Sequence, residues 1–146
     1  MFRALMSLLI ASLFLLAPAS AEQKLQVGDY AIHYVSFGST FLTPQIAKNY
    51  GITRSRYTGL VNVSVIDTSQ PTDETHAVPV AISGTARNLL GSSKTLEFKE
   101  IREGDAIYYI AELSHSNEET FTFNIELSNG SDLNTKLRFE QKFYVD

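Results

Sequence analysis

Three histidines, scattered along the chain, are the first candidates for chemistry at neutral pH. They are His33, His76 and His115, and no two lie at a spacing that would bring them onto one helical turn or one strand face. A loop with Asp73, Glu74 and His76 offers carboxylate oxygens and one imidazole, a donor set that suits a divalent cation. The more ordinary interpretation is a solvated acidic loop, so this is only a weak candidate metal site.

The most specific pattern is a stretch in which aromatic rings alternate with arginines. Of the seven Tyr and nine Phe residues in the chain, six lie between Tyr30 and Tyr57. Rings and guanidinium groups are enriched at interfaces, and Arg54 and Arg56 would face the same way in an extended segment and grip a carboxylate or phosphate. The alternative is that the rings are core residues and the arginines are simply solvated. The residues that we expect to bind are His33, Tyr34, Phe41, Tyr50, Arg54, Arg56 and Tyr57.

The composition excludes several classes of function. The 146-residue chain has no Cys, which removes thiol nucleophiles, disulfides and thiolate metal sites. Its net charge of -4 does not favour nucleic-acid binding. The sequence also lacks the common zinc-protease, serine-hydrolase and dinucleotide-binding motifs. We therefore assign no cofactor and no catalytic residue, and the balance favours a protein that is not an enzyme.

The N-terminus has the three parts of a secretory signal. Arg3 supplies the positive charge, residues 4–16 form an apolar run, and the small residues 19–21 follow Pro18 in the pattern that signal peptidase cleaves. The run is shorter than the roughly 20 residues that a membrane-spanning helix needs. We expect cleavage after Ala21, export to the periplasm or beyond, and one mature domain, residues 22–146, without a membrane span.

Beyond the signal, apolar and polar residues alternate with the period of two that indicates strands with one buried face. The clearest run of buried positions is Phe121, Phe123, Ile125 and Leu127. Other strands are expected at 27–37, 57–67, 94–101, 106–115 and 137–145. A further strand around residues 78–82 contains Pro79, which lacks a backbone donor and favours an edge position. Near Tyr108 both faces are apolar, which indicates an interior strand or a covered outer face.

One short helix is expected at residues 44–50. Thr43 can cap its N-terminus, Pro44 suits the first helical position, and Gly51 can end it in the left-handed conformation. With about seven strands and this helix in a connection, the sequence predicts an all-β fold, an antiparallel immunoglobulin-like β-sandwich. A flattened barrel is the alternative.

Several short segments, taken in order, carry a family resemblance. They are Gly28-Asp29-Tyr30, Ile32-His33-Tyr34, Ser39-Thr40-Phe41-Leu42 with Pro44, Tyr50-Gly51-Ile52 with Arg54-Ser55, Asn62-Val63-Ser64-Val65, Phe98-Lys99-Glu100-Ile101 and Ala106-Ile107-Tyr108-Tyr109-Ile110-Ala111. Together they resemble the bacterial exported family named domain of unknown function 4426, over nearly all of the mature chain. The resemblance implies a small periplasmic or secreted domain, and it brings no assigned reaction and no catalytic residue.

Three functions remain open at this point. The first is a periplasmic binding or protein-interaction module, which would contact an envelope protein or a small anionic ligand through the aromatic and arginine-rich stretch. The second is a metal-dependent or hydrolytic periplasmic enzyme that uses His33 or the loop at residues 73–76. The third is an assembly or folding factor for envelope proteins. A sandwich can host any of these functions, so the fold does not choose among them.

Overall fold

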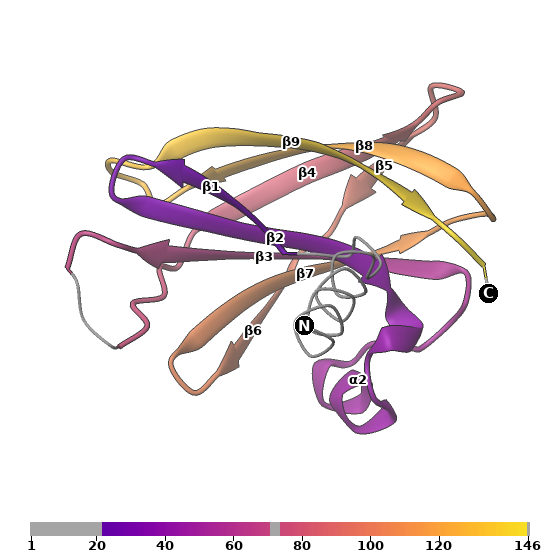
Figure 1. Cartoon of the computed structure of the whole chain (residues 1–146), viewed down its shortest axis with the longest axis horizontal. Helices are drawn as coiled ribbons and strands as arrows, with labels where there is room; N and C mark the ends of the chain where they lie inside the picture. The colour runs from indigo at the N-terminus through magenta and orange to yellow at the C-terminus, as the bar shows by residue number, and fades with distance from the viewer. Residues whose placement is uncertain (1–21, 71–73, 146) are drawn as a thin grey trace, which may run out of the picture.

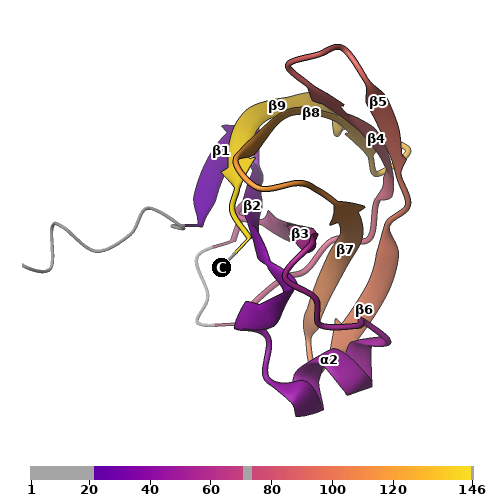
Figure 2. The same cartoon turned by 90° about the vertical axis from the view of Figure 1, so that its right-hand side faces the viewer.

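Two antiparallel sheets, packed face to face, make up the domain (Figures 1 and 2). The computed structural model describes residues 22–70 and 74–145, so the predicted signal peptide and Asp73 lie outside the described residues. The five-stranded sheet consists, in spatial order, of β1 (Gln23–Val27), β2 (Tyr30–Gly38), β3 (Thr58–Asp67), β7 (Ala106–Ser114) and β6 (Lys99–Glu103). The four-stranded sheet consists of β5 (Ser93–Leu96), β4 (Ala81–Asn88), β8 (Glu119–Ser128) and β9 (Asn134–Phe143). This arrangement confirms the predicted antiparallel sandwich.

The core lies between the two sheets and is built by the predicted alternation. Phe121, Phe123 and Ile125 of β8 have no exposed surface, and Leu127 is almost fully buried. From the other sheet, the valines at 61, 63 and 65 of β3 point into the same cluster. Each such side chain contributes about 1.5–3 kcal/mol when it is fully removed from water, so this interlayer contact stabilises the fold without any disulfide.

The described residues form nine strands rather than about seven, because two stretches are organised differently from the prediction. At the start, β1 adds a strand that pairs with β2 across a turn at Gly28, whose φ of 56° is left-handed. Further on, the expected strand at 94–101 is two strands, since β5 belongs to the four-stranded sheet and β6 to the five-stranded sheet. The chain changes sheets at Glu97 and Phe98.

The predicted edge position of the strand after Pro79 is wrong. The strand β4 begins only at Ala81 and lies between β5 and β8, in the interior of its sheet. Pro79 instead belongs to a link that crosses between the layers, where Ala77 still bridges to Ile66 of β3. Because the missing N–H of the proline falls in this link, the strand loses no ladder hydrogen bond.

The connection between β2 and β3 holds the short helix that the sequence predicts. After a 3-10 turn, η1 (Ser39–Phe41), the helix α2 (Pro44–Tyr50) begins with the Thr43 hydroxyl accepting from the backbone N–H of Ile46 at 3.2 Å. It ends at Gly51, whose φ is 68°. Figure 2 shows α2 on the side of the five-stranded sheet that faces away from the other sheet. Within the described ranges, no helix has the length and apolarity to cross a membrane.

Candidate functional site

The outer face of the five-stranded sheet is divided into two halves. In the first, which we call the closed half, Phe37, Leu60 and Ile110 pack under residues of the helical connection. Ile110 of β7 is buried there, which accounts for the apolar character that the sequence shows on both faces of this strand. In the second half the sheet is open, and a cavity of about 270 Å³ lies over it. The face therefore offers one packed region and one hollow.

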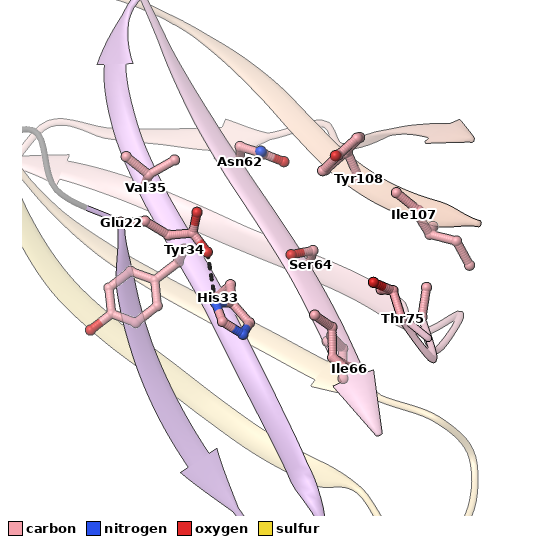
Figure 3. A pocket seen from close by; sticks show the side chains of 13 residues that line it. Glu22, His33, Tyr34, Val35, Asn62, Ser64, Ile66, Thr75, Ile107 and Tyr108 are labelled. Carbon is pink, nitrogen blue, oxygen red and sulfur yellow. Dashed lines mark ion pairs between the residues drawn. The ribbon is translucent and has the colours of Figure 1, made fainter. Parts of the chain in front are cut away.

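We call this cavity the trough; its floor is formed by side chains of neighbouring strands (Figure 3). His33 of β2 stands opposite Ser64 of β3, and Val35 stands opposite Asn62, so these four side chains share one face. Tyr108 of β7 continues the floor. The walls come from Glu22 and from the link at Thr75 and Ala77.

An ion pair orients the imidazole in the trough. Nδ1 of His33 lies 2.6 Å from Oε1 of Glu22, and Figure 3 marks this contact. Because the carboxylate can only accept, it favours a proton on Nδ1 and leaves Nε2 of a neutral ring as an acceptor. Both partners keep contact with solvent, since the His33 side chain is 27% exposed and the Glu22 side chain 58%. The pair therefore determines which donors and acceptors the trough presents, and it contributes little to the stability of the domain.

Asn62 contributes an unsatisfied polar atom to the trough. Its Oδ1 is enclosed by protein and has no hydrogen-bond partner among the described residues. A buried acceptor without a partner costs about 1–3 kcal/mol. The sequence analysis did not single out Asn62 or Ser64 as site residues. The signal that could have found Asn62 is its place in mid-strand, because Asn is depleted in strands.

A second hollow, of about 420 Å³, lies where the connection returns to β3. We call it the arginine hollow; it is lined by Thr40, Arg54, Ser55, Arg56 and Tyr57. Two segments form it, and they are joined because the buried Ser39 hydroxyl accepts from the N–H of Ser55 at 2.9 Å and donates to its carbonyl at 2.8 Å. Arg54 also donates through Nη2 to the carbonyl of Thr40 at 3.1 Å. These bonds fix the shape of the hollow before anything binds.

Exposed rings and unpaired cations surround the arginine hollow. Phe41, next to Thr40, is 77% exposed, and Tyr57 is 58% exposed. In the part of the chain that the structure describes, neither Arg54 nor Arg56 forms an ion pair. Among the residues that the structure describes, no acidic side chain lines this hollow. The arrangement suits an anion, which two guanidinium groups can hold through charge-assisted hydrogen bonds.

The seven residues that the sequence analysis selected do not lie on one surface. Phe41, Arg54, Arg56 and Tyr57 gather at the arginine hollow, and His33 lies in the trough. Tyr34, which also borders the trough, packs its ring 4.7 Å from that of Phe139 on the other sheet.

Tyr50 lies apart from both hollows. Its ring packs against the closed half, and its hydroxyl donates to Oε2 of Glu103. That hydrogen bond, with burial adding to it, raises the pKa of Tyr50 to about 12. This tyrosine therefore joins the connection to β6 rather than facing a ligand.

The candidate metal loop is only partly described. Glu74 is exposed and His76 is half-buried, while Asp73 lies outside the described residues. Backbone pairing between the N–H of Asp67 and the carbonyl of His76, at 2.8 Å, holds the end of the loop against β3. Among the residues with described positions, no group of three His, Asp or Glu side chains lies close enough to share a metal ion. A metal at this loop stays a prediction.

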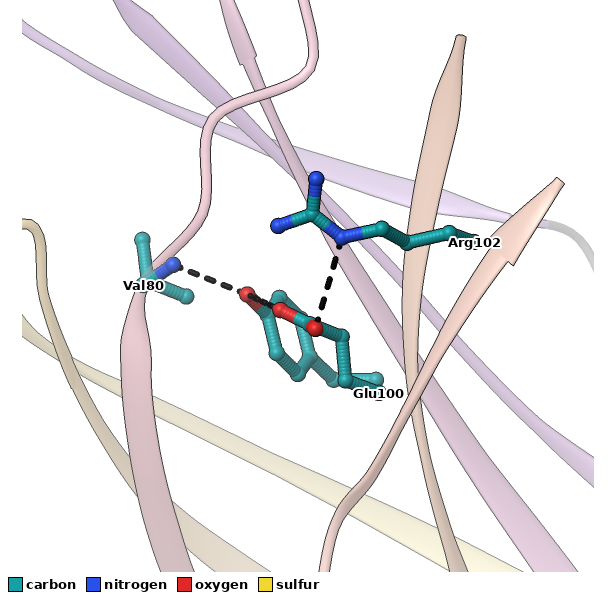
Figure 4. A network of polar contacts seen from close by, with 4 residues as sticks. Val80, Glu100 and Arg102 are labelled. Atoms are coloured by element: carbon teal, nitrogen blue, oxygen red, sulfur yellow. Dashed lines mark hydrogen bonds and ion pairs between the residues drawn. The ribbon is translucent and has the colours of Figure 1, made fainter. Parts of the chain in front are cut away.

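A polar network secures the link that walls the trough (Figure 4). The hydroxyl of Tyr109 accepts from the N–H of Val80 at 2.9 Å and donates to Oε1 of Glu100 at 3.1 Å. Arg102 then contacts the other oxygen of Glu100 at 3.4 Å. Hydrogen bonds from Arg102 and Tyr109 keep the pKa of Glu100 below its ordinary value. The network therefore ties the link to β6 and β7.

Comparison with solved structures supports the fold. A DUF4426 family protein from Pseudomonas aeruginosa PAO1 shares 30% sequence identity, with 88% of this chain and 99% of that chain covered and a TM-score of 0.75. FetP from uropathogenic Escherichia coli strain F11 is 12% identical, with coverage of 85% and 94% and a TM-score of 0.59. A copper-bound variant of FetP is also 12% identical, with coverage of 84% and 95% and a TM-score of 0.59. At this identity, the likeness to FetP shows the fold alone.

A search of the curated proteins found no match. The segments that carry the family resemblance in the sequence contribute several residues to both hollows, among them His33, Asn62 and Ser64 in the trough and Arg54 and Ser55 in the arginine hollow. The family model described as a domain of unknown function, DUF4426, matches residues 24–146. The chain therefore belongs to the DUF4426 family.

Proposed function

We propose that this protein is an exported binding module that holds an anionic group of its partner in the arginine hollow. The observation that carries the proposal is the pair of guanidinium groups, Arg54 and Arg56, beside one hollow that no acidic side chain from residues 22–70 or 74–145 lines. A carboxylate or a phosphate matches their donor geometry. The partner is an envelope protein that presents such a group, or a small anionic ligand.

The rigid frame of the hollow supports this function. Because the hydrogen bonds between Ser39 and Ser55 already join the two segments, little conformational entropy is lost when an anion arrives. The exposed rings of Phe41 and Tyr57 add apolar area at the rim of the same surface. Aromatic residues beside arginines are the combination that dominates binding energy at many protein interfaces.

The signal-like N-terminus supports a site of action outside the cytoplasm. Residues 1–21 have the charge, the apolar run and the small-residue cleavage pattern of an exported chain. A chain without Cys also needs no redox machinery to fold in an oxidising compartment. We therefore place the binding module in the periplasm or beyond it, with the mature chain beginning at Glu22.

Titration with inorganic phosphate, and separately with a short peptide that carries several carboxylates, tests the proposal. The side-chain N–H signals of Arg54 and Arg56 should shift in NMR spectra of the intact domain, and calorimetry should give the affinity. The double variant R54E/R56E should weaken binding at least about tenfold, since each charged hydrogen bond contributes about 1.5–3 kcal/mol. Its melting temperature should stay close to that of the parent, because both side chains are exposed and the two Ser39–Ser55 hydrogen bonds remain when the Arg54 bond to Thr40 is lost.

The double variant R138E/K142E is a matched control for charge. It replaces two exposed cations of β9 and changes the net charge by the same amount as R54E/R56E. Its affinity for both probes should remain within about twofold of the parent, since charges on a distant face are largely screened. Equal loss in the two double variants would show a general charge effect and would contradict a site at the arginine hollow, as would no binding of either probe.

A further inference from the structure

The turn between β4 and β5 carries two adjacent leucines into solvent. Leu89 is 77% exposed and Leu90 is 93% exposed, the highest value among the large apolar side chains of the described residues. We call this pair the leucine tip. Figure 1 shows the turn projecting from one end of the sandwich, beyond the strands on either side. The fold gains no packing from either side chain, so their place in the turn calls for another explanation.

Asn88 pairs three backbone N–H groups of the turn. Oδ1 of Asn88 accepts from the N–H of Leu90 at 3.1 Å and from that of Ser92 at 2.8 Å. The carbonyl of Asn88 accepts from the N–H of Gly91 at 3.1 Å, and its own N–H donates to the carbonyl of Ser92 at 3.0 Å. Pairing of these N–H groups lowers the cost of placing the turn next to hydrocarbon, where no water replaces a lost hydrogen bond.

A cation lies at the base of the leucine tip. The guanidinium of Arg87 packs beside Gly91, and within the described ranges it forms no ion pair. Lys94 stands nearby and donates to the carbonyl of Ser114 at 2.6 Å. Glu119, at the start of β8, accepts from Nδ2 of Asn88 at 2.9 Å. A free guanidinium directly behind an apolar tip suits an anionic surface with an apolar layer beneath it.

The same end of the sandwich carries an exposed tyrosine. Asn88 pairs with Phe121 at the start of β8, and Glu119 pairs with Phe143 at the end of β9, so Tyr144 follows at this end. It is 54% exposed, and Nζ of Lys142 lies 5.6 Å from its ring centroid. Tyrosine and lysine are enriched where proteins meet the headgroup layer of a membrane.

We propose that the leucine tip inserts into the interfacial layer of a phospholipid bilayer that carries anionic headgroups, with Arg87 at the level of the phosphates. Two side chains and one cation give weak, reversible binding rather than permanent anchoring. The paired N–H groups of the turn, the apolar pair and the free cation together favour a lipid surface over a pocket on another protein. This contact is separate from the arginine hollow and does not depend on the function proposed for it.

A tryptophan reporter tests the insertion directly, because the chain contains no Trp. The variant L90W should show a blue shift of its emission when vesicles of phosphatidylcholine and phosphatidylglycerol are added. Bromine-labelled acyl chains in the same vesicles should quench the emission. The control S131W carries an indole on the exposed turn between β8 and β9, at the opposite end of that sheet. Its emission should not change with vesicles.

Sedimentation with the same vesicles measures the contribution of each group. The double variant L89S/L90S should lower the partition coefficient by about tenfold or more, because apolar area no longer leaves water. Its melting temperature should match the parent, since both leucines are exposed. The variant R87E should lower binding about fivefold on anionic vesicles and leave weak binding to pure phosphatidylcholine unchanged. Unchanged L90W emission, an equal shift in S131W, or full binding by L89S/L90S would each overturn the proposal.

Discussion

The closed half and the trough are built on the same strands of the same sheet, and yet one is packed and the other is open. In β3 the outward side chain is a fully buried leucine at residue 60, and two positions later it is a half-buried Asn62. The next outward residue, Ser64, is also polar. On β3 the helical connection covers Leu60 and ends before Asn62 and Ser64. On this strand the covered stretch therefore ends where the outward side chains become polar.

This difference separates residues that stabilise the fold from residues that are available for another role. A packed outward side chain contributes free energy of folding in proportion to the apolar area it buries. A polar side chain in an open trough contributes little, and an unpaired buried atom such as Oδ1 of Asn62 lowers stability. We expect substitutions in the two halves to change the free energy of unfolding by different amounts. A substitution of Asn62 should raise it, whereas a substitution in the closed half should lower it.

The largest expected effect is in the closed half. Leu60→Ala should lower the free energy of unfolding by about 2–5 kcal/mol, because it leaves a cavity between β3 and the connection. Ser64→Ala, two residues from Asn62 on the same strand, should change it by less than about 0.5 kcal/mol. Urea denaturation followed by circular dichroism measures both. If Ser64→Ala lowered the free energy of unfolding as much as Leu60→Ala, the side chains of the trough would serve to stabilise the fold.

A smaller change, of opposite sign, is expected from Asn62→Val. Valine fits a half-buried strand position and removes the unpaired oxygen, so the free energy of unfolding should rise by about 1 kcal/mol. Asn124→Val is the matched control, since Asn124 is an exposed strand amide on the other sheet. Its effect should stay below about 0.5 kcal/mol. If Asn62→Val destabilised the domain instead, the amide would have a partner in solution.

The smallest expected effect is a pH dependence on the border of the closed half. Because the hydrogen bond to Glu103 raises the pKa of Tyr50 from 10.0 to about 12, the unfolded chain releases this proton first. The contribution of this hydrogen bond to the free energy of unfolding is therefore complete below pH 10 and is lost as the pH rises toward about 12. Tyr50→Phe should remove the part of the stability loss that comes from this ionisation. Urea denaturation of both proteins at a series of pH values measures it, as the difference between their free energies of unfolding. The same slope in both proteins would show that the hydrogen bond does not form in solution.

Much of the fold could be predicted from local patterns. The alternation along β8 identified its buried face, and Thr43, Pro44 and Gly51 marked both ends of α2. The strand β1 gave no signal because nearly all of its side chains are exposed, so no apolar period appears. The change of sheet after Leu96 was also invisible, because alternation continues on either side of it. Which sheet a strand joins depends on distant partners and not on its own pattern.

The candidate site was predictable only in part, for the same reason. The period of two in β2 puts Tyr34 on the face of Ile32, a core position, and His33 on the opposite face, although the sequence analysis selected both as binding residues. The grouping of Arg54 with Tyr57 followed from closeness in sequence. The trough did not, since its walls come from Glu22 and Thr75, far from the floor in sequence. Residues that meet only through tertiary contacts leave no period or motif to read.

Three links between the described strands change sheets, and they have a mechanical consequence. They run from β3 to β4 through Ala77 and Val80, from β5 to β6 through residues 97 and 98, and from β7 to β8 through residues 115–118. Because the chain crosses repeatedly between the two sheets, neither sheet can unfold while the other stays folded. Under a pulling force the domain should therefore resist as a single body and then unfold in one step.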